Sequence, residues 1–172
     1  MVELLLHFTI PLTILLALNV KLRRAILYSL IALLPDIDAI FLVHRSITHS
    51  ALIITSIMIA LLYLKHKNKI SMKTWIITYL MLLSHLILDL FTGYTPILWP
   101  IINQSIWINT ELITHIGSTP TLSLKIIILS KPTTFEILKE LDAPIFTSEG
   151  LIISLLLTIP TTIKNIIYNR NE

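Results

Sequence analysis

Long apolar runs alternate with short polar or basic segments along the 172-residue chain. A helix needs about 20 apolar residues to cross the roughly 30 Å hydrocarbon core of a bilayer. Five runs approach this length, and we predict that they are membrane spans. They cover residues 4–20, a segment that starts near residue 25, and residues 48–64, 74–91 and 150–168.

The second run contains a break in its helical pattern, because Pro35 is followed by Asp36 and Asp38. Proline removes a backbone hydrogen bond from a helix, and carboxylates are costly in lipid. We therefore expect the helix to break at this motif. Pro11 and Pro160 stand inside other runs and are expected to kink their helices rather than end them.

Residues 94–149 are polar, punctuated by prolines and too interrupted to span a membrane. Within them, residues 126–129 form a short apolar run that suits either a strand or a helix. The residues from Thr133 to Glu136 resemble a capping box, which predicts a short amphipathic helix as far as residue 141. Its apolar side chains Phe135, Leu138 and Leu141 are expected to face the membrane or the bundle.

Together these patterns predict an all-α membrane protein with about five transmembrane helices. The chain is expected to form a single integral membrane domain over residues 1–172, with a core bundle at residues 1–93 and 150–170. Residues 94–149 are expected to form a polar extracytoplasmic insertion before the last helix, lying as a cap over the core bundle.

The composition supports membrane insertion, since 55% of the residues are hydrophobic and only 13% are charged. Soluble domains carry about 25% charged residues. This contrast excludes a soluble enzyme, a disordered chain and an ordinary nucleic-acid-binding module. The predicted partner is membrane lipid, with no nucleic acid. The chain has no cysteine, so it has no thiolate metal ligand and no disulfide.

The basic residues predict how the chain crosses the membrane. Nine of the 13 lie on one side of a five-span arrangement, together with the C-terminus: Lys21, Arg23, Arg24, Lys65, Lys67, Lys69, Lys73, Lys164 and Arg170. Basic loops stay in the cytoplasm. We therefore expect a multi-pass protein of the cell membrane, with its N-terminus outside and its C-terminus cytoplasmic.

Ionisable groups inside the predicted spans are costly and indicate function. They are His7, Asp36, Asp38, His49, His85 and Asp89, with His44 in a short connection. At about 1.5 Å per helical residue, those in the spans lie roughly 18–24 Å from the nearest basic boundary. Each could serve an ordinary role in packing, capping or hydrogen bonding. Their shared depth instead predicts one site below the outer surface.

The residue types in this layer suit a metal ion. His85 and Asp89 are four positions apart and share a helix face. Imidazole with carboxylate suits zinc or another first-row divalent ion. Four histidines and three aspartates exceed the four ligands of one zinc, which predicts two ions or one ion with supporting acids. The predicted metal ligands are His7, Asp36, His44, His49, His85 and Asp89.

Two further residues are candidates for catalysis. Asp38, or alternatively Asp36, could accept a proton from water as a general base. Arg45 follows the predicted ligand His44 and could neutralise a phosphate or carboxylate of the substrate. An interfacial anchor is the other interpretation of Arg45.

Three motifs in order carry a resemblance to a known family. They are LPDID at 34–38, HRSITHS at 44–50, and SHLILD at 84–89, which leads to PILWP at 96–100. They resemble the YdjM-like family of membrane-bound, metal-dependent hydrolases, and His7 is similar to the family's N-terminal histidine. The resemblance covers about residues 1–100, with Ser46 where members often have glycine. More distantly, the pattern is similar to the all-helical zinc enzymes of the phospholipase C type.

The leading hypothesis is a membrane-embedded, metal-dependent hydrolase that acts on a phosphoester or a lipid headgroup at the outer leaflet. Its cofactor would be a divalent metal, zinc above all, as one or two ions. Two alternatives remain open at this point: a metal-binding transporter or ion-coupled carrier, and a structural membrane protein stabilised by zinc.

Overall fold

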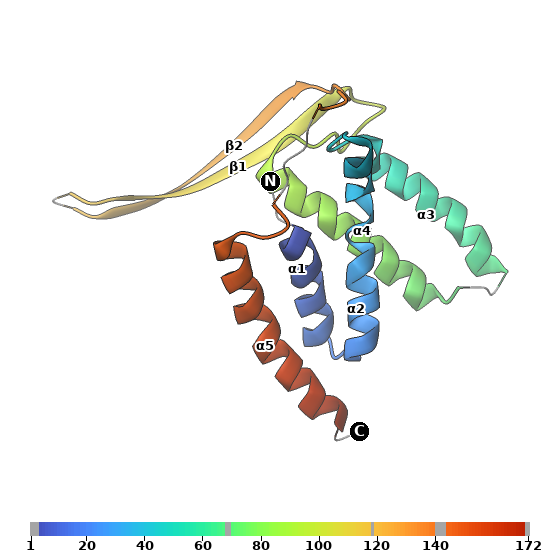
Figure 1. The fold of residues 1–172 in the computed structure, drawn as a ribbon. Coiled ribbons are helices and arrows are strands. Elements are labelled where there is room, and N and C mark those ends of the chain that lie inside the picture. Colours follow the sequence, from blue (N-terminus) through green and yellow to red (C-terminus); the bar gives the residue numbers. More distant parts are fainter. Residues whose placement is uncertain (1–3, 68–69, 118, 140–143, 171–172) are drawn as a thin grey trace.

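The computed structural model describes residues 4–67, 70–117, 119–139 and 144–170 (Figure 1). These residues form five α-helices and two short 3-10 segments, and a two-stranded antiparallel sheet lies between the last two helices in sequence. The helices are α1 (Leu4–Ala17), α2 (Leu22–Ile31), α3 (Ala51–His66), α4 (Met72–Thr92) and α5 (Ser148–Arg170). The 3-10 segments are η1 (Leu34–Phe41) and η2 (Ile47–His49), and the strands are β1 (Gln104–His115) and β2 (Thr121–Pro132).

The prediction of about five transmembrane helices is wrong, because several of the helices are too short to cross a bilayer. Among the described residues, two helices are long and apolar enough to cross a membrane: α4, with 21 residues, and the Ser148–Tyr168 part of α5. The 14 residues of α1 and the 10 of α2 span roughly 21 and 15 Å, too short for a hydrocarbon core of about 30 Å. The chain turns at Asn19, which has a positive φ of 59°, and so α1 ends before its apolar run does.

The predicted break at Pro35 is confirmed. Helix α2 ends at Ile31, and the chain continues through Pro35 as the 3-10 segment η1 rather than as an α-helix. Both of the other prolines considered above, Pro11 and Pro160, lie inside helices.

The insertion is a β-hairpin, so the all-α prediction is also wrong. Gln104 pairs with Pro132 and the register continues to His115 opposite Thr121. The apolar run at 126–129 lies in β2. Residues 135–139 are not helical, which contradicts the predicted amphipathic helix; its last two positions, 140 and 141, lie outside the described residues. Strand β2 is rich in isoleucine, which favours strands, and it pairs with β1. This pairing stabilises a hairpin rather than a helix in the insertion.

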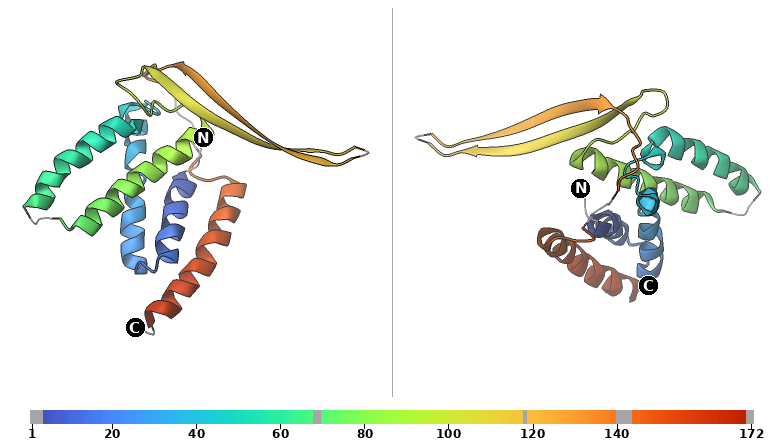
Figure 2. Two further views of the ribbon diagram at one scale, coloured as in Figure 1. Left: turned by 180° about the vertical axis from the view of Figure 1, so that it is seen from behind. Right: turned by 45° about the horizontal axis from the view of Figure 1, so that its top comes forward.

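The hairpin projects sideways from one end of the helices, while its base packs against them (Figures 1 and 2). The Ala51 amide donates to the Ile97 carbonyl at 3.0 Å, at the start of α3. The Leu138 amide donates to the carbonyl of Leu42, just after η1, at 2.8 Å. The connections on both sides of the hairpin are therefore tied to the end of the bundle that carries η1 and η2.

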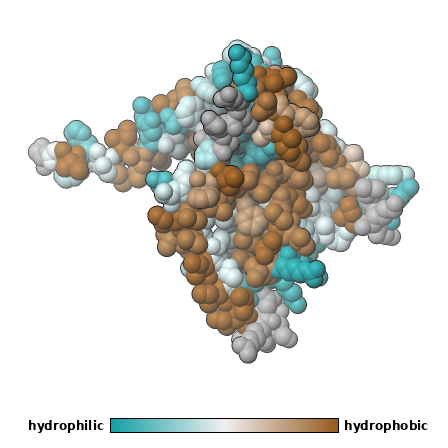
Figure 3. Space-filling model, viewed as in Figure 1, coloured by the Kyte–Doolittle hydropathy of each residue, from teal (hydrophilic) through white to brown (hydrophobic). Residues whose placement is uncertain are grey.

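Polar contacts join α5 to α1. The Thr9 and Ser154 hydroxyl groups lie 3.0 Å apart in a buried pair. The buried side-chain amide of Asn165 donates to the Leu16 carbonyl near the end of α1 and to the Val20 carbonyl just beyond it, at 3.2 and 3.0 Å. The outer surface of α5 is strongly apolar, as the brown surface in Figure 3 shows.

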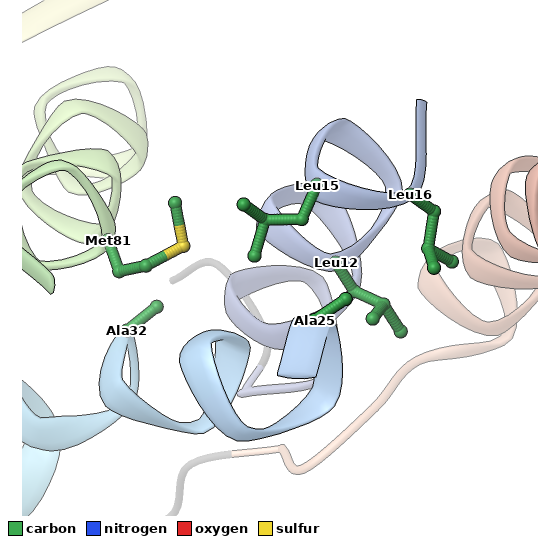
Figure 4. Close-up of a cluster of buried hydrophobic side chains, with 6 residues drawn as sticks. All are labelled: Leu12, Leu15, Leu16, Ala25, Ala32 and Met81. Carbon is green, nitrogen blue, oxygen red and sulfur yellow. The ribbon is translucent and has the colours of Figure 1, made fainter. Parts of the chain in front are cut away.

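Two apolar clusters hold α4 in place. The first joins α1, α2 and α4 (Figure 4) and consists of Leu12, Leu15, Leu16, Ala25, Ala32 and Met81. The second joins α3 to α4 through Ile54, Met58 and Leu86. Because Met81 and Leu86 anchor α4 on two sides, the segment that carries His85 has a defined position between them.

Candidate metal centre

The predicted site residues come from five segments that meet at one end of the bundle. His7 lies in α1, and Asp36 and Asp38 lie in η1. His44 and Arg45 lie in the connection between η1 and η2, His49 ends η2, and His85 and Asp89 lie in the last part of α4. Figure 1 shows η1, η2 and the end of α4 gathered beneath the base of the hairpin.

The connection from η1 to α3 reverses the chain within a few residues. Leu42 and Arg45 adopt left-handed backbone conformations with φ of 57° and 58°, which are uncommon for residues other than glycine. The turn then ends at Ser50, whose hydroxyl accepts a hydrogen bond from the Ile53 amide and caps α3. Strained backbone of this kind persists where surrounding structure holds it, often at functional sites.

Four donors form the centre of the cluster, and their atoms lie at the spacing expected around one ion. The Nε2 atoms of His49 and His85 are 3.2 Å apart. Each lies 3.2 Å from Asp89 Oδ2, and they lie 3.3 and 3.4 Å from Asp36 Oδ1. In a tetrahedral zinc site with bonds of about 2.0–2.1 Å, ligand atoms lie roughly 3.3–3.4 Å apart. These residues therefore fit a small divalent ion.

Three of the four donor residues are buried. His49 and His85 are 0% exposed and Asp89 is 2% exposed, whereas the Asp36 side chain is 17% exposed. Asp89 Oδ2 has no hydrogen-bond partner among the described residues, although two imidazoles approach it. An unpartnered buried carboxylate oxygen is costly unless a cation compensates it. The geometry leaves the Asp36 side as the route of access.

Asp38 orients one of these imidazoles. Its Oδ2 accepts hydrogen bonds from the Ser46 amide at 2.8 Å and the Thr48 hydroxyl at 3.0 Å, and lies 3.2 Å from His49 Nδ1. A carboxylate at the outer nitrogen of a histidine directs the other nitrogen toward a metal. Burial by itself raises the pKa of Asp38, but the hydrogen bonds from His49 and Ser46 hold it below its ordinary value.

Arg45 holds the second aspartate. Its Nη2 donates to Asp89 Oδ1 at 2.7 Å and to the Thr92 hydroxyl at 2.8 Å. Gly93 provides the space, since a Cβ at this position would overlap Arg45 Nη1. The φ of Gly93 is 168°, which any residue can adopt, so the glycine is required for room rather than for backbone conformation.

A second group shares one residue with the first. Asp36, Asp38 and His44 each offer a ligand atom within 4.8 Å of the others. Asp38 Oδ1 and His44 Nε2 are buried without a hydrogen-bond partner among the described residues. Burial lowers the pKa of His44 below its ordinary value, and the charge of Arg45 lowers it further. Asp36 therefore stands between two sets of donors.

His7 lies beside the cluster but in neither donor group. Its ring stacks on His85, with centroids 4.0 Å apart and an angle of 23° between the planes. Its Nε2 is 3.7 Å from Asp89 Oδ1. The structure thus places His7 in contact with a donor of the four-residue group rather than inside that group.

The charge of the cluster also suits a cation. Three carboxylates and one guanidinium leave a net charge of −2 when the imidazoles are neutral. Net negative charge that is mostly buried requires compensation. A His/Asp cluster that could hold a metal ion is therefore present, formed from residues predicted as ligands.

Sequence reasoning missed the residues that support these donors. Thr48 and Ser46 bind Asp38, while Thr92 and Gly93 accommodate Arg45. Ser46 and Thr48 each stand next to a predicted site residue, and Thr92 and Gly93 follow Asp89 by three and four positions. That proximity is the signal by which they could have been found.

Similarity to a known protein family extends over nearly the whole chain. A family model described as YdjM inner membrane protein matches residues 1–167, which include the hairpin as well as the three motifs. No curated protein and no solved structure matches the chain. The match covers nearly the whole chain, and two of the described helices are long and apolar enough to cross a membrane, as expected for an inner membrane protein. The chain belongs to the YdjM inner membrane protein family.

Proposed function

We propose that this chain is a membrane-embedded, metal-dependent hydrolase that cleaves a phosphoester bond, with a lipid headgroup as the favoured substrate. The observation that carries the proposal is the group of four donors at tetrahedral spacing, closed by protein except toward Asp36. A centre accessible from one side, at the end of a membrane helix, suits a substrate that resides at the bilayer surface.

Zinc is the ion we propose, because it binds histidine nitrogen and carboxylate oxygen and favours tetrahedral coordination. When bound, the ion would act as a Lewis acid that activates water and polarises the scissile group. The chain's own residues hold and orient the donors. Asp38 keeps the His49 Nε2 lone pair directed inward, and Arg45 binds Asp89 Oδ1 so that Oδ2 remains free.

These contacts support positioning roles for Asp38 and Arg45, in place of the general base and substrate clamp expected from the sequence. Asp38 Oδ2 already serves Ser46, Thr48 and His49. The Nη2 of Arg45 is already bound to Asp89 and Thr92. A residue held in this way acts on the reaction through the donor that it orients.

We further propose that the centre binds two ions, with Asp36 as the shared ligand. His49, His85 and Asp89 complete the first set, while Asp38 and His44 complete the second. The buried, unpartnered Asp38 Oδ1 and His44 Nε2 support the second set, since a cation would satisfy both atoms.

Metal stoichiometry tests the second ion. Protein freed of metal and reloaded with zinc should hold two equivalents per chain by elemental analysis, as expected for two separate donor sets. His44→Ala should hold one equivalent, because it removes a donor of the second set alone. His44→Gln is the alternative if the alanine variant fails to fold. One equivalent in the unaltered protein, or two in a His44 variant, would contradict the second ion.

The orientation of the chain is part of the proposal. Lys21, Arg24 and Lys73 lie at the end of the bundle opposite the centre, since they flank the start of α2 and α4 while the centre includes the last turns of α4. Basic ends stay in the cytoplasm. This supports a centre on the outer side, with the N-terminus outside and the C-terminus cytoplasmic.

The hydrolase proposal is tested with zinc-loaded protein in detergent micelles. We expect release of the headgroup from a labelled glycerophospholipid, loss of this activity with a chelator, and its return when zinc is added. A soluble nitrophenyl phosphodiester serves as the comparison substrate. Full metal content with no cleavage of either phosphoester would contradict the proposal.

A zinc-stabilised structural protein is the second candidate, because structural zinc sites have four protein ligands. The four-donor group matches that number. The same experiment separates the two candidates. A structural site predicts that the chelator lowers the unfolding temperature while no substrate is cleaved by the loaded protein.

A further inference from the structure

A cavity of about 660 Å³ lies at the end of the bundle away from the metal centre. It is bounded by the connection from α1 to α2, by α2 itself and by the start of α4. Figure 1 shows the connection from α1 to α2 at the lower end of these two helices, opposite η1 and η2. None of the residues proposed to hold metal lines this cavity.

Positive charge surrounds the mouth of the cavity. Lys21, Arg24 and Lys73 line it, and within the described part of the chain no acidic residue does. None of the three forms an ion pair with another described residue, in contrast to Arg45 at the metal centre. The cavity therefore presents three cationic groups that no acid of the described chain neutralises.

Along α2 and α4, the residues that line the cavity change from basic and hydroxyl-bearing near the helix starts to apolar further on. Tyr28 joins α2 to α4, because its hydroxyl group lies 3.2 Å from the hydroxyl group of Thr74. The Ser71 hydroxyl group lies 2.9 Å from that of Thr74. The apolar residues Ile31 and Ile77 stand about one turn further along α2 and α4, toward the middle of the bundle. Cations and hydroxyl groups bind phosphate, whereas an apolar wall binds hydrocarbon.

The position of the cavity favours a lipid. Helix α4 is about 31 Å long, so its ends lie near the two headgroup layers when it crosses a bilayer. Lys73 stands in the first turn of α4 and would lie at headgroup level. We propose that this cavity binds the phosphate group of one anionic phospholipid, with an acyl chain against its apolar wall.

Native mass spectrometry of the full chain in detergent tests the site. We expect one phosphatidylglycerol per chain to bind about tenfold more tightly than phosphatidylcholine, because juxtamembrane lysine and arginine attract anionic lipid. The triple variant Lys21→Gln, Arg24→Gln, Lys73→Gln should lose that preference. The control removes the same charge from the hairpin and the segment after it: Lys125→Gln, Lys131→Gln, Lys139→Gln. It should retain the preference.

Two further measurements distinguish the binding of a lipid from the binding of free phosphate. Leu27 lines the cavity and is exposed, so Leu27→Ser should weaken lipid binding without unfolding the bundle. Millimolar inorganic phosphate should not displace phosphatidylglycerol. Equal binding of the two lipids, an equal loss in the hairpin control, or displacement by phosphate would each overturn the proposal.

Discussion

Replacing His85 with alanine should abolish hydrolysis and remove one equivalent of metal per chain. His85 Nε2 lies 3.2–3.4 Å from the other three donor atoms of its group, so its loss leaves three ligands and an open side within the bundle. Elemental analysis measures the metal, and headgroup release measures activity. Insertion into the membrane and the elution volume in detergent should remain those of the unaltered protein.

His66→Ala is the matched control, since His66 is exposed at the far end of α3 and belongs to neither donor group. It should change neither metal content nor activity. The removal of Asp36 should have a larger effect than that of His85, because Asp36 belongs to both groups, and Asp36→Ala should lose both equivalents. Unchanged metal content in the His85 and Asp36 variants would refute the metal centre.

Replacing Arg45 with methionine should weaken metal binding by about 10- to 100-fold, the usual cost of removing a residue that orients a metal ligand. The guanidinium holds Asp89 Oδ1 at 2.7 Å, and without it the carboxylate is free to rotate away from the two imidazoles. Arg45→Lys should recover only part of the loss, because Arg45 Nη2 donates to both Asp89 and Thr92, and a lysine lacks the rigid, planar guanidinium that directs these two bonds. Competition with a chelator of known affinity measures the change.

Gly93→Ala tests the same contact without altering a charged residue. The added methyl group would occupy the space of Arg45 Nη1 and should displace the guanidinium from Asp89. We expect a loss of metal affinity in the same direction as for Arg45→Met, and no further loss when the two changes are combined. Additive losses in the double variant would show that Gly93 acts on another part of the site.

The residues of the His/Asp cluster could be identified from the sequence. His85 and Asp89 stand four positions apart on one helix, so their common face follows from helical geometry alone. The break at Pro35 is similarly local, because proline removes a hydrogen bond wherever it stands inside a helix. The structure places Asp36, His49, His85 and Asp89 in one group, as their residue types and the shared depth of their spans indicated.

The number of membrane-spanning helices could not be determined in this way. Apolar residues continue beyond the end of α1 to Val20, yet Asn19 turns the chain and Val20 packs against the core cluster. An apolar run does not fix the ends of a helix, since α1 is shorter than its run whereas α4 and α5 extend beyond theirs. The actual ends depend on which residues the neighbouring helices bury.

What the sequence determined by itself was therefore local: which residues can bind metal, which share a helix face, and where a helix breaks. The tertiary structure decided the hairpin, because residues 104 and 132 are paired only once the chain has folded back on itself. It also decided the contacts of Asp38 and Arg45. Arg45 reaches Asp89 across 44 positions of sequence, and a contact of that kind depends on how helices pack rather than on any pattern along one of them.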